Sequence, residues 1–309
     1  MKSLNTVILL LVSILIAVNA RAALYKWVDD QGITHYSDIA PKQNKFEDIE
    51  VKILSGGNRY SGSVDQFQGG LVADFSDSIA FGNPGQAELY FVSFAGDSKQ
   101  DVFMNEALYT QKLFDAQYKT AGRSVALINN QKTTSSNLVA SNENLERALK
   151  VMGKKMNDED VLYLYLTSHG SRDHQLSVDF PPHTVKDFGA FEVRRMLDEA
   201  DIKWRVIVVS ACFAGGFIEP LKSPYTVIAT ASDSAHSSFG CSDDRDFTYY
   251  GEAIFKQQMA QGLGIMRSLQ GAQGIVTQME KASGYSASNP LLWSGAAVAT
   301  KMAELERLR

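Results

Sequence analysis

The sequence predicts an α/β fold, a mainly parallel sheet flanked by helices, with a small N-terminal β-hairpin module. The apolar runs at 161–167 and 204–209 each stop abruptly at small or polar residues. Unbroken apolar runs of this length are typical of parallel strands buried on both faces. From residue 87 onward, strand-like and helix-like segments alternate. Parallel strands need such helical crossovers, so we expect helices on both faces of the sheet.

The first 22 residues have the pattern of a secretory signal peptide. Lys2 precedes an apolar run at 7–18 that is broken only by Ser13, and the small-x-small triplet at 20–22 marks a cleavage site. The run is shorter than the roughly 20 residues that a transmembrane helix needs. We therefore expect this segment to be removed by signal cleavage, and the mature protein to be periplasmic or secreted. An uncleaved membrane anchor is the alternative.

Residues 23–45 are expected to form a β-hairpin module. Apolar and polar residues alternate at 24–28 and 33–37, and the connector 29–32 ends in Gly32. This stretch resembles a short module of unknown function that follows signal peptides in many proteobacterial envelope proteins. The resemblance implies a Gram-negative source and an envelope location, and it says nothing about chemistry.

Residues 46–85 are expected to be a linker, because glycines and serines punctuate them without a regular apolar pattern. One or two edge strands could lie within it, and the last domain is expected to span 86–309. In that domain the pattern predicts strands at 89–96, 124–128, 161–167, 204–210 and 225–230, and helices at 102–121, 142–155, 188–200, 249–259 and 264–281. Loops or hairpins are expected at 171–186 and 231–246.

A histidine and a cysteine each follow one of the buried strands. His169 and Gly170 come after the run 161–167, and Cys212 comes after Ser210 and Ala211. Open α/β sheets place their chemistry at the carboxyl ends of the strands. A thiol nucleophile needs an imidazole nearby to take or share its proton. We therefore predict that neighbouring strand ends bring His169 and Cys212 together as a catalytic dyad.

These residues resemble the clan of cysteine peptidases that includes caspases, gingipains and legumains, most closely the bacterial legumains. In that clan a His-Gly pair and an Ala-Cys pair follow two hydrophobic blocks. The resemblance covers about residues 88–299 and is supported by SACFAGG at 210–216, ATAS at 229–232, SFGC at 238–241 and TYYG at 248–251.

The resemblance implies a caspase- or legumain-like core and a cysteine endopeptidase acting on protein or peptide substrates. Cys212 would be the nucleophile and His169 the general acid/base, with the backbone N–H groups of Gly170 and Cys212 as the oxyanion hole. No cofactor or metal is implied. A transamidase or peptide ligase using the same dyad is the nearest alternative, and a catalytically silent envelope-binding protein is the alternative from another class.

Substrate-binding residues are expected around the dyad. Ser210 stands where eukaryotic legumains have an acidic residue that helps to bind asparagine. Asp97 stands near the position of a family asparagine, and Ser232 lies in the later matching segment. Asp243 or Asp244 could supply an acidic wall, although solvated loop acids are an equal alternative.

The remaining histidines and the second cysteine have less specific interpretations. His174 and His183 are expected to be solvated loop residues, and a zinc site built from them and His169 has the wrong spacing. Cys241 is expected to be a structural or incidental thiol, with a disulfide to Cys212 as the alternative in an oxidising compartment.

Bulk composition excludes some partners. The 309-residue chain is 45% hydrophobic with a formal net charge of −5, and signal cleavage would remove only positive charges, Lys2 and Arg21. A moderately acidic chain without a basic run is a poor candidate for binding nucleic acid or anionic membranes. We expect no stable membrane insertion after cleavage, and the sequence favours no particular oligomeric state.

Overall fold

The computed structural model describes residues 25–28, 34–37, 68–242 and 244–307. The predicted signal peptide and most of the predicted linker lie outside these residues. Strands β1 (Tyr25–Val28) and β2 (Thr34–Ser37) pair antiparallel, with Tyr25 opposite Ser37, as the hairpin pattern predicts. Within the described residues, no helix is both long and apolar enough to cross a membrane.

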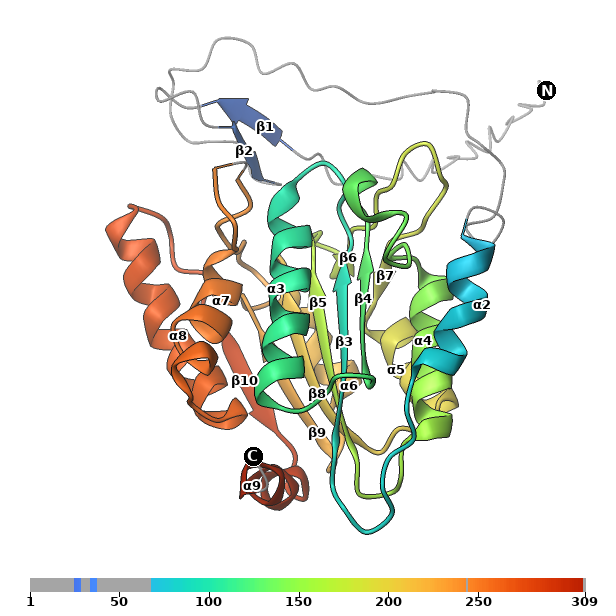
Figure 1. Cartoon of the computed structure of the whole chain (residues 1–309). Coiled ribbons are helices and arrows are strands. Elements are labelled where there is room, and N and C mark those ends of the chain that lie inside the picture. The colour runs from blue at the N-terminus through green and yellow to red at the C-terminus, as the bar shows by residue number, and fades with distance from the viewer. Residues whose placement is uncertain (1–24, 29–33, 38–67, 243, 308–309) are drawn as a thin grey trace, which may run out of the picture.

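A six-stranded sheet forms the centre of the large domain (Figure 1). Its strand order is β10-β9-β8-β5-β3-β4, and every neighbouring pair is parallel except the edge pair of β10 and β9. The strands are β3 (Leu89–Ala95), β4 (Ser124–Ile128), β5 (Val161–Thr167), β8 (Trp204–Ser210), β9 (Thr226–Thr230) and β10 (Leu291–Ser294). The prediction of a mainly parallel α/β fold is therefore confirmed.

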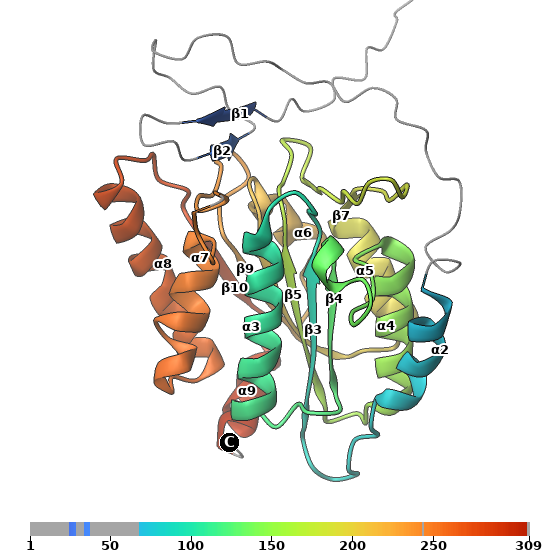
Figure 2. The same cartoon turned by 45° about the horizontal axis from the view of Figure 1, so that its top comes forward.

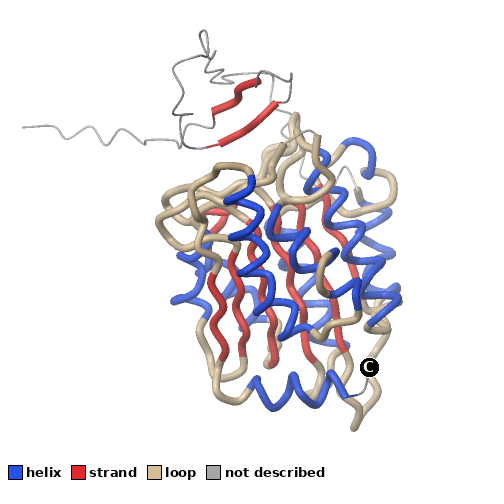
Figure 3. Tube along the Cα trace, turned by 90° about the vertical axis from the view of Figure 1, so that its left-hand side faces the viewer, coloured by secondary structure: helices blue, strands red, loops and turns tan. Residues whose placement is uncertain are grey.

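Helices cover both faces of this sheet (Figures 1 and 3). Along β3, Tyr90, Val92 and Phe94 join one buried cluster, whereas Leu89 and Phe91 join the cluster on the opposite face. The first cluster includes residues of α4 (Asn142–Lys155), α5 (Ala190–Glu199) and α6 (Ile218–Leu221). The second includes residues of α3 (Asp101–Gln117), α7 (Tyr249–Gly251), α8 (Ile265–Ala282) and α9 (Val298–Arg307). This alternation is what a strand buried on both faces requires.

Short elements connect these layers. Strands β6 (Gln175–Leu176) and β7 (Phe188–Gly189) pair antiparallel and form the hairpin that the segment after β5 was expected to contain. The single-turn helices are η1 (Gln131–Thr133), η2 (Ala214–Phe217), η3 (Glu252–Lys256) and η4 (Met259–Gln261).

Two segments differ from the sequence prediction. Part of the expected linker forms helix α2 (Gly69–Ser78), and its Phe75 packs into the core together with Ile79. The paired glycines at the start of this helix are typical of a turn in the sequence. Burial of Phe75 in the core stabilises the helix despite the low helix propensity of these glycines. The predicted helix 249–259 is divided into α7, η3 and η4, with a π-helical turn at Glu252–Lys256.

We expect strand β5, near the centre of the sheet, to contribute strongly to the stability of the fold. Leu164 of β5 is fully buried in the core, so Leu164→Ala should lower the free energy of unfolding by about 2–5 kcal/mol, the usual cost of a core cavity. Phe191 of α5 is 76% exposed, and Phe191→Ala should change it by no more than about 0.5 kcal/mol. Urea unfolding followed by circular dichroism measures both; equal losses would contradict the described packing.

Candidate active site

Strands β5 and β8 are neighbours in the sheet and run parallel. Thr167 at the end of β5 lies opposite Ser210 at the end of β8, and the Ser168 N–H donates to the Ser210 carbonyl at 3.2 Å. His169 and Cys212 each follow two residues after this last pair. The register therefore delivers both residues to the same edge of the sheet, where the loops that follow the parallel strands gather (Figure 2).

The backbones that carry the two residues are in direct contact. A Cβ atom built on Gly170 would lie 2.1 Å from the Cys212 carbonyl oxygen and 3.1 Å from its nitrogen. No side chain fits in that space. Glycine after the histidine is therefore what lets the two strand ends approach this closely.

The His169 ring is held from the side by helix α3. Its imidazole is 7% exposed and packs edge to face against Phe103, with ring centroids 5.2 Å apart. The start of α3 is fixed in turn by Asp97, whose Oδ1 accepts from the backbone N–H groups of Lys99 and Gln100 at 2.9 and 3.2 Å. The side chain of Asp97 thus organises a turn in front of the helix.

The Cys212 sulfur is partly exposed and lies against the loop that follows β9. The Ser238 N–H group donates to Sγ at 3.4 Å, and the Ser238 hydroxyl lies 3.8 Å from it. Both cysteines are free thiols, so the predicted alternative of a Cys212–Cys241 disulfide is not found. The backbone donor favours the charged form of the thiol, whereas the Ser238 carbonyl oxygen, 3.6 Å from Sγ, can accept a hydrogen bond only from the neutral form.

The turn after Cys212 is strained and clamped. Phe213 has φ of 56°, the left-handed region that a bulky residue occupies only when its surroundings impose it. Its N–H donates to the His236 carbonyl at 2.9 Å, and its own carbonyl lies 3.0 Å from His174 Nδ1. Because a carbonyl only accepts, His174 Nδ1 carries the proton. The Arg172 guanidinium stacks over the Phe213 ring at 5.0 Å.

The prediction that His174 is a solvated loop residue is therefore wrong. The hairpin of β6 and β7 folds the loop back over the nucleophile turn, and His174 lies against Gly216 as well as Phe213. This contact depends on two distant segments meeting, and no local pattern in the sequence marks it. His183, by contrast, stacks on Phe180 within its own loop.

Two residues expected to bind substrate support the site from below. Ser232 is fully buried; its hydroxyl donates to the Ala211 carbonyl and accepts from the Ala214 N–H, each at 3.1 Å. Ser210 is also buried, with its hydroxyl 3.0 Å from Thr248 Oγ1. Both hydroxyls are thus hydrogen-bonded inside the protein, and a role of Ser210 and Ser232 in substrate binding stays a prediction.

The acidic residues expected near the site have different surroundings. Asp97 is 3% exposed, and its Oδ1 accepts hydrogen bonds within its own turn; a role in substrate binding stays a prediction. Asp243 lies outside the described residues, and Asp244 is exposed. A pair that sequence reasoning missed is Asp233 with His236, whose Nδ1 lies 2.7 Å from Asp233 Oδ1. Among the described residues, no three His, Cys, Asp or Glu side chains gather to hold a metal.

The comparisons with known proteins fit this arrangement. Residues 129–263 match the model of the peptidase C13 family, and residues 11–52 match a domain of unknown function, DUF4124. The segment 129–263 is thus similar to the peptidase C13 family. The matched segment contains both His169 and Cys212, and the family is the legumain family of cysteine peptidases. A search of curated proteins gives no match.

The two thiols of this protein should react at different rates. Burial holds the pKa of the Cys241 thiol well above its usual value, so little of it is thiolate at pH 8. We expect iodoacetamide to alkylate Cys212 at least about tenfold faster than Cys241, measured by peptide mass spectrometry. In unfolded protein the two rates should converge; faster labelling of Cys241 in the native state would contradict the raised pKa of its thiol.

Substitution of Gly170 should disturb the site. In Gly170→Ala the new methyl group overlaps the Cys212 carbonyl, which must move. We expect alkylation of Cys212 to slow by about tenfold or more, since displacements near 1 Å are costly at reacting centres. Gly274→Ala, in α8 with open space around it, is the matched control and should label like wild type. Equal labelling of all three proteins would refute the contact.

Proposed function

We propose that the protein is a cysteine endopeptidase that cleaves peptide bonds through an acyl-enzyme on Cys212, with His169 as general acid/base. One observation carries the proposal: the in-register pairing of β5 and β8 sets these two residues at adjacent strand ends. The match of residues 129–263 to a family of cysteine peptidases supports the reaction class. Neither a cofactor nor a metal enters the mechanism.

The reaction proceeds in two steps. The Cys212 thiolate attacks the substrate carbonyl carbon and forms a C–S bond, and the carbonyl π electrons move to oxygen. When the tetrahedral intermediate collapses, the C–N bond breaks and the leaving amine takes a proton from His169. Water then loses a proton to His169 and attacks the thioester carbon. Collapse of the second intermediate releases the new carboxyl group, and the C–S bond breaks.

The oxyanion is proposed to bind the backbone N–H groups of Gly170 and Cys212. The close approach of these two segments supports this assignment, because it sets the two amides beside one another. Preorganised amide donors of this kind contribute strongly to acyl-transfer catalysis. The clamped turn at Phe213 supports it further, since it limits movement of the adjoining Cys212 backbone.

We also propose that the protein works in the periplasm or is secreted. The charged, apolar and small-residue segments at 1–22 support this location. The match to DUF4124 begins within this segment, at residue 11, and extends to residue 52.

A peptide library analysed by mass spectrometry tests the activity. Wild-type protein should generate cleavage products, and Cys212→Ala and His169→Ala should each lower their rate of formation by about 10³-fold or more. Cys241→Ala is the matched control and should retain activity, because the thiol at 241 takes no part. Wild-type cleavage by Cys212→Ala would refute the mechanism.

An added amine separates hydrolysis from acyl transfer. If the acyl-enzyme reacts with water, products keep free carboxyl termini when the amine is present. Amine-capped products would instead show a transferase that uses the same dyad.

A further inference from the structure

We propose that Glu106 is a positioning residue that fixes the end of β5, the end of β8 and the loop 231–248 relative to one another. It would thereby hold His169 in place beside Cys212. This inference rests on the proposed function for its catalytic consequence, but the geometry stands independently of it.

Glu106 is fully buried on helix α3, and four hydrogen bonds converge on its carboxylate. Oε2 accepts from the Tyr165 hydroxyl at 2.5 Å and from the Thr167 hydroxyl at 2.6 Å. Oε1 accepts from the Thr248 hydroxyl at 2.7 Å and from the Thr248 N–H at 3.1 Å. Three segments far apart in the sequence therefore meet at one side chain.

With Glu106 ionised, the hydrogens in this network have one consistent arrangement. The Thr248 hydroxyl has one hydrogen, and a carboxylate can only accept, so that hydrogen points to Glu106. Ser210 must then donate to Thr248 Oγ1, which is 3.0 Å away. Glu106 thus holds the end of β8 through Thr248 and Ser210, as it holds the end of β5 through Thr167 directly.

These anchoring points lie immediately below the dyad. Thr167 is two residues before His169, and Ser210 is two residues before Cys212. A displacement of either strand end would change the separation of the imidazole and the sulfur. Glu106 contacts neither reacting group in this arrangement and acts through the segments that carry them.

A buried charge is a costly means of holding a fold together. Burial raises the pKa of the Glu106 carboxyl, and hydrogen bonds from Thr167, Tyr165 and Thr248 oppose that rise. All four of these donors are neutral groups, and apolar packing of equal volume often stabilises a protein as well as a buried ion does. What the carboxylate adds is direction, because it accepts four donors in fixed positions.

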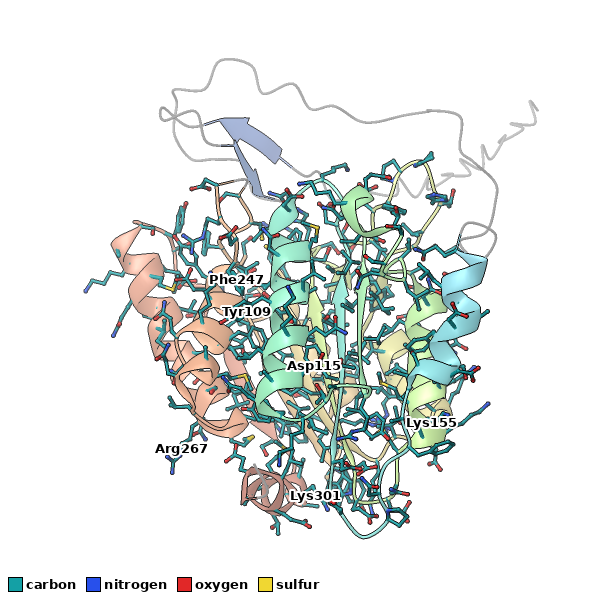
Figure 4. All side chains as sticks on the ribbon, in the orientation of Figure 1. Tyr109, Asp115, Lys155, Phe247, Arg267 and Lys301 are labelled. Carbon is teal, nitrogen blue, oxygen red and sulfur yellow. The ribbon has the colours of Figure 1, made fainter. Side chains whose placement is uncertain are left out.

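The same face of α3 contacts the other parts of the site. Phe103, one turn before Glu106, packs against the His169 ring. Tyr109, one turn after it, packs edge to face on Phe247, with centroids 5.1 Å apart (Figure 4). One rigid helix therefore contacts the base, the network and the loop in three successive turns.

The end of helix α7 leaves room for the carboxylate. A Cβ atom on Gly251 would lie 1.8 Å from Glu106 Oε1, so only glycine leaves room there. The Gly251 N–H also donates to Thr248 Oγ1 at 3.0 Å. The Thr248 hydroxyl oxygen therefore accepts two hydrogen bonds, one from Ser210 and one from Gly251.

Variants of Glu106 and Thr248 test the proposal. Glu106→Gln keeps the volume but directs an amide NH₂ at existing donors. It should lower kcat for peptide cleavage by about tenfold or more with KM changed less than about threefold, and slow Cys212 alkylation similarly. Thr248→Val removes the hydroxyl link and should show the same split, whereas Thr248→Ser keeps the hydroxyl and should restore both rates to within about threefold of wild type.

Each outcome decides the proposal. Wild-type kcat and alkylation in folded Glu106→Gln would overturn it, and so would equal losses in Thr248→Ser and Thr248→Val. If Glu106→Gln does not fold, the threonine pair decides alone. If wild-type protein cleaves no peptide, the proposed function fails, and the Cys212 alkylation rates still test the role of Glu106.

Discussion

The parallel register of β5 with β8 is the constraint on which the site depends. Because Thr167 lies opposite Ser210, the two segments leave the sheet at the same level and at adjacent positions. Strand separation then limits how far apart their next residues can be. Both strands are buried on both faces by helices, so the register cannot slip without displacing apolar side chains from two cores.

The pairing of β5 with β8 positions the backbones that carry His169 and Cys212, and further contacts fix the turn that follows Cys212. Phe213 adopts a left-handed conformation only because His236, His174 and Arg172 hold it from three sides. Ser232 joins the residues before and after this turn from inside. Local strain at the nucleophile is thus offset by contacts from loops that are remote in the chain, a pattern common at functional sites.

Glu106 shows the same principle with a charge. Its carboxylate replaces apolar packing with four directed hydrogen bonds, which specify one arrangement of the strand ends and the loop 231–248. In the sequence, Glu106 is one glutamate within a predicted helix, and no local pattern marks it as buried. Charged residues are almost never fully buried without partners, and those partners lie about 60 and 140 positions away along the chain.

The sequence by itself determined the α/β class, the five parallel strands and the placement of His169 and Cys212 at strand ends. These features follow from apolar runs and the residues that end them, which are local signals. Only the tertiary structure decided helix α2, the turn contact of His174, the burial of Ser210 and Ser232, and the network of Glu106. Each of these depends on segments that meet only after folding, and local propensity carries no information about which segments will meet.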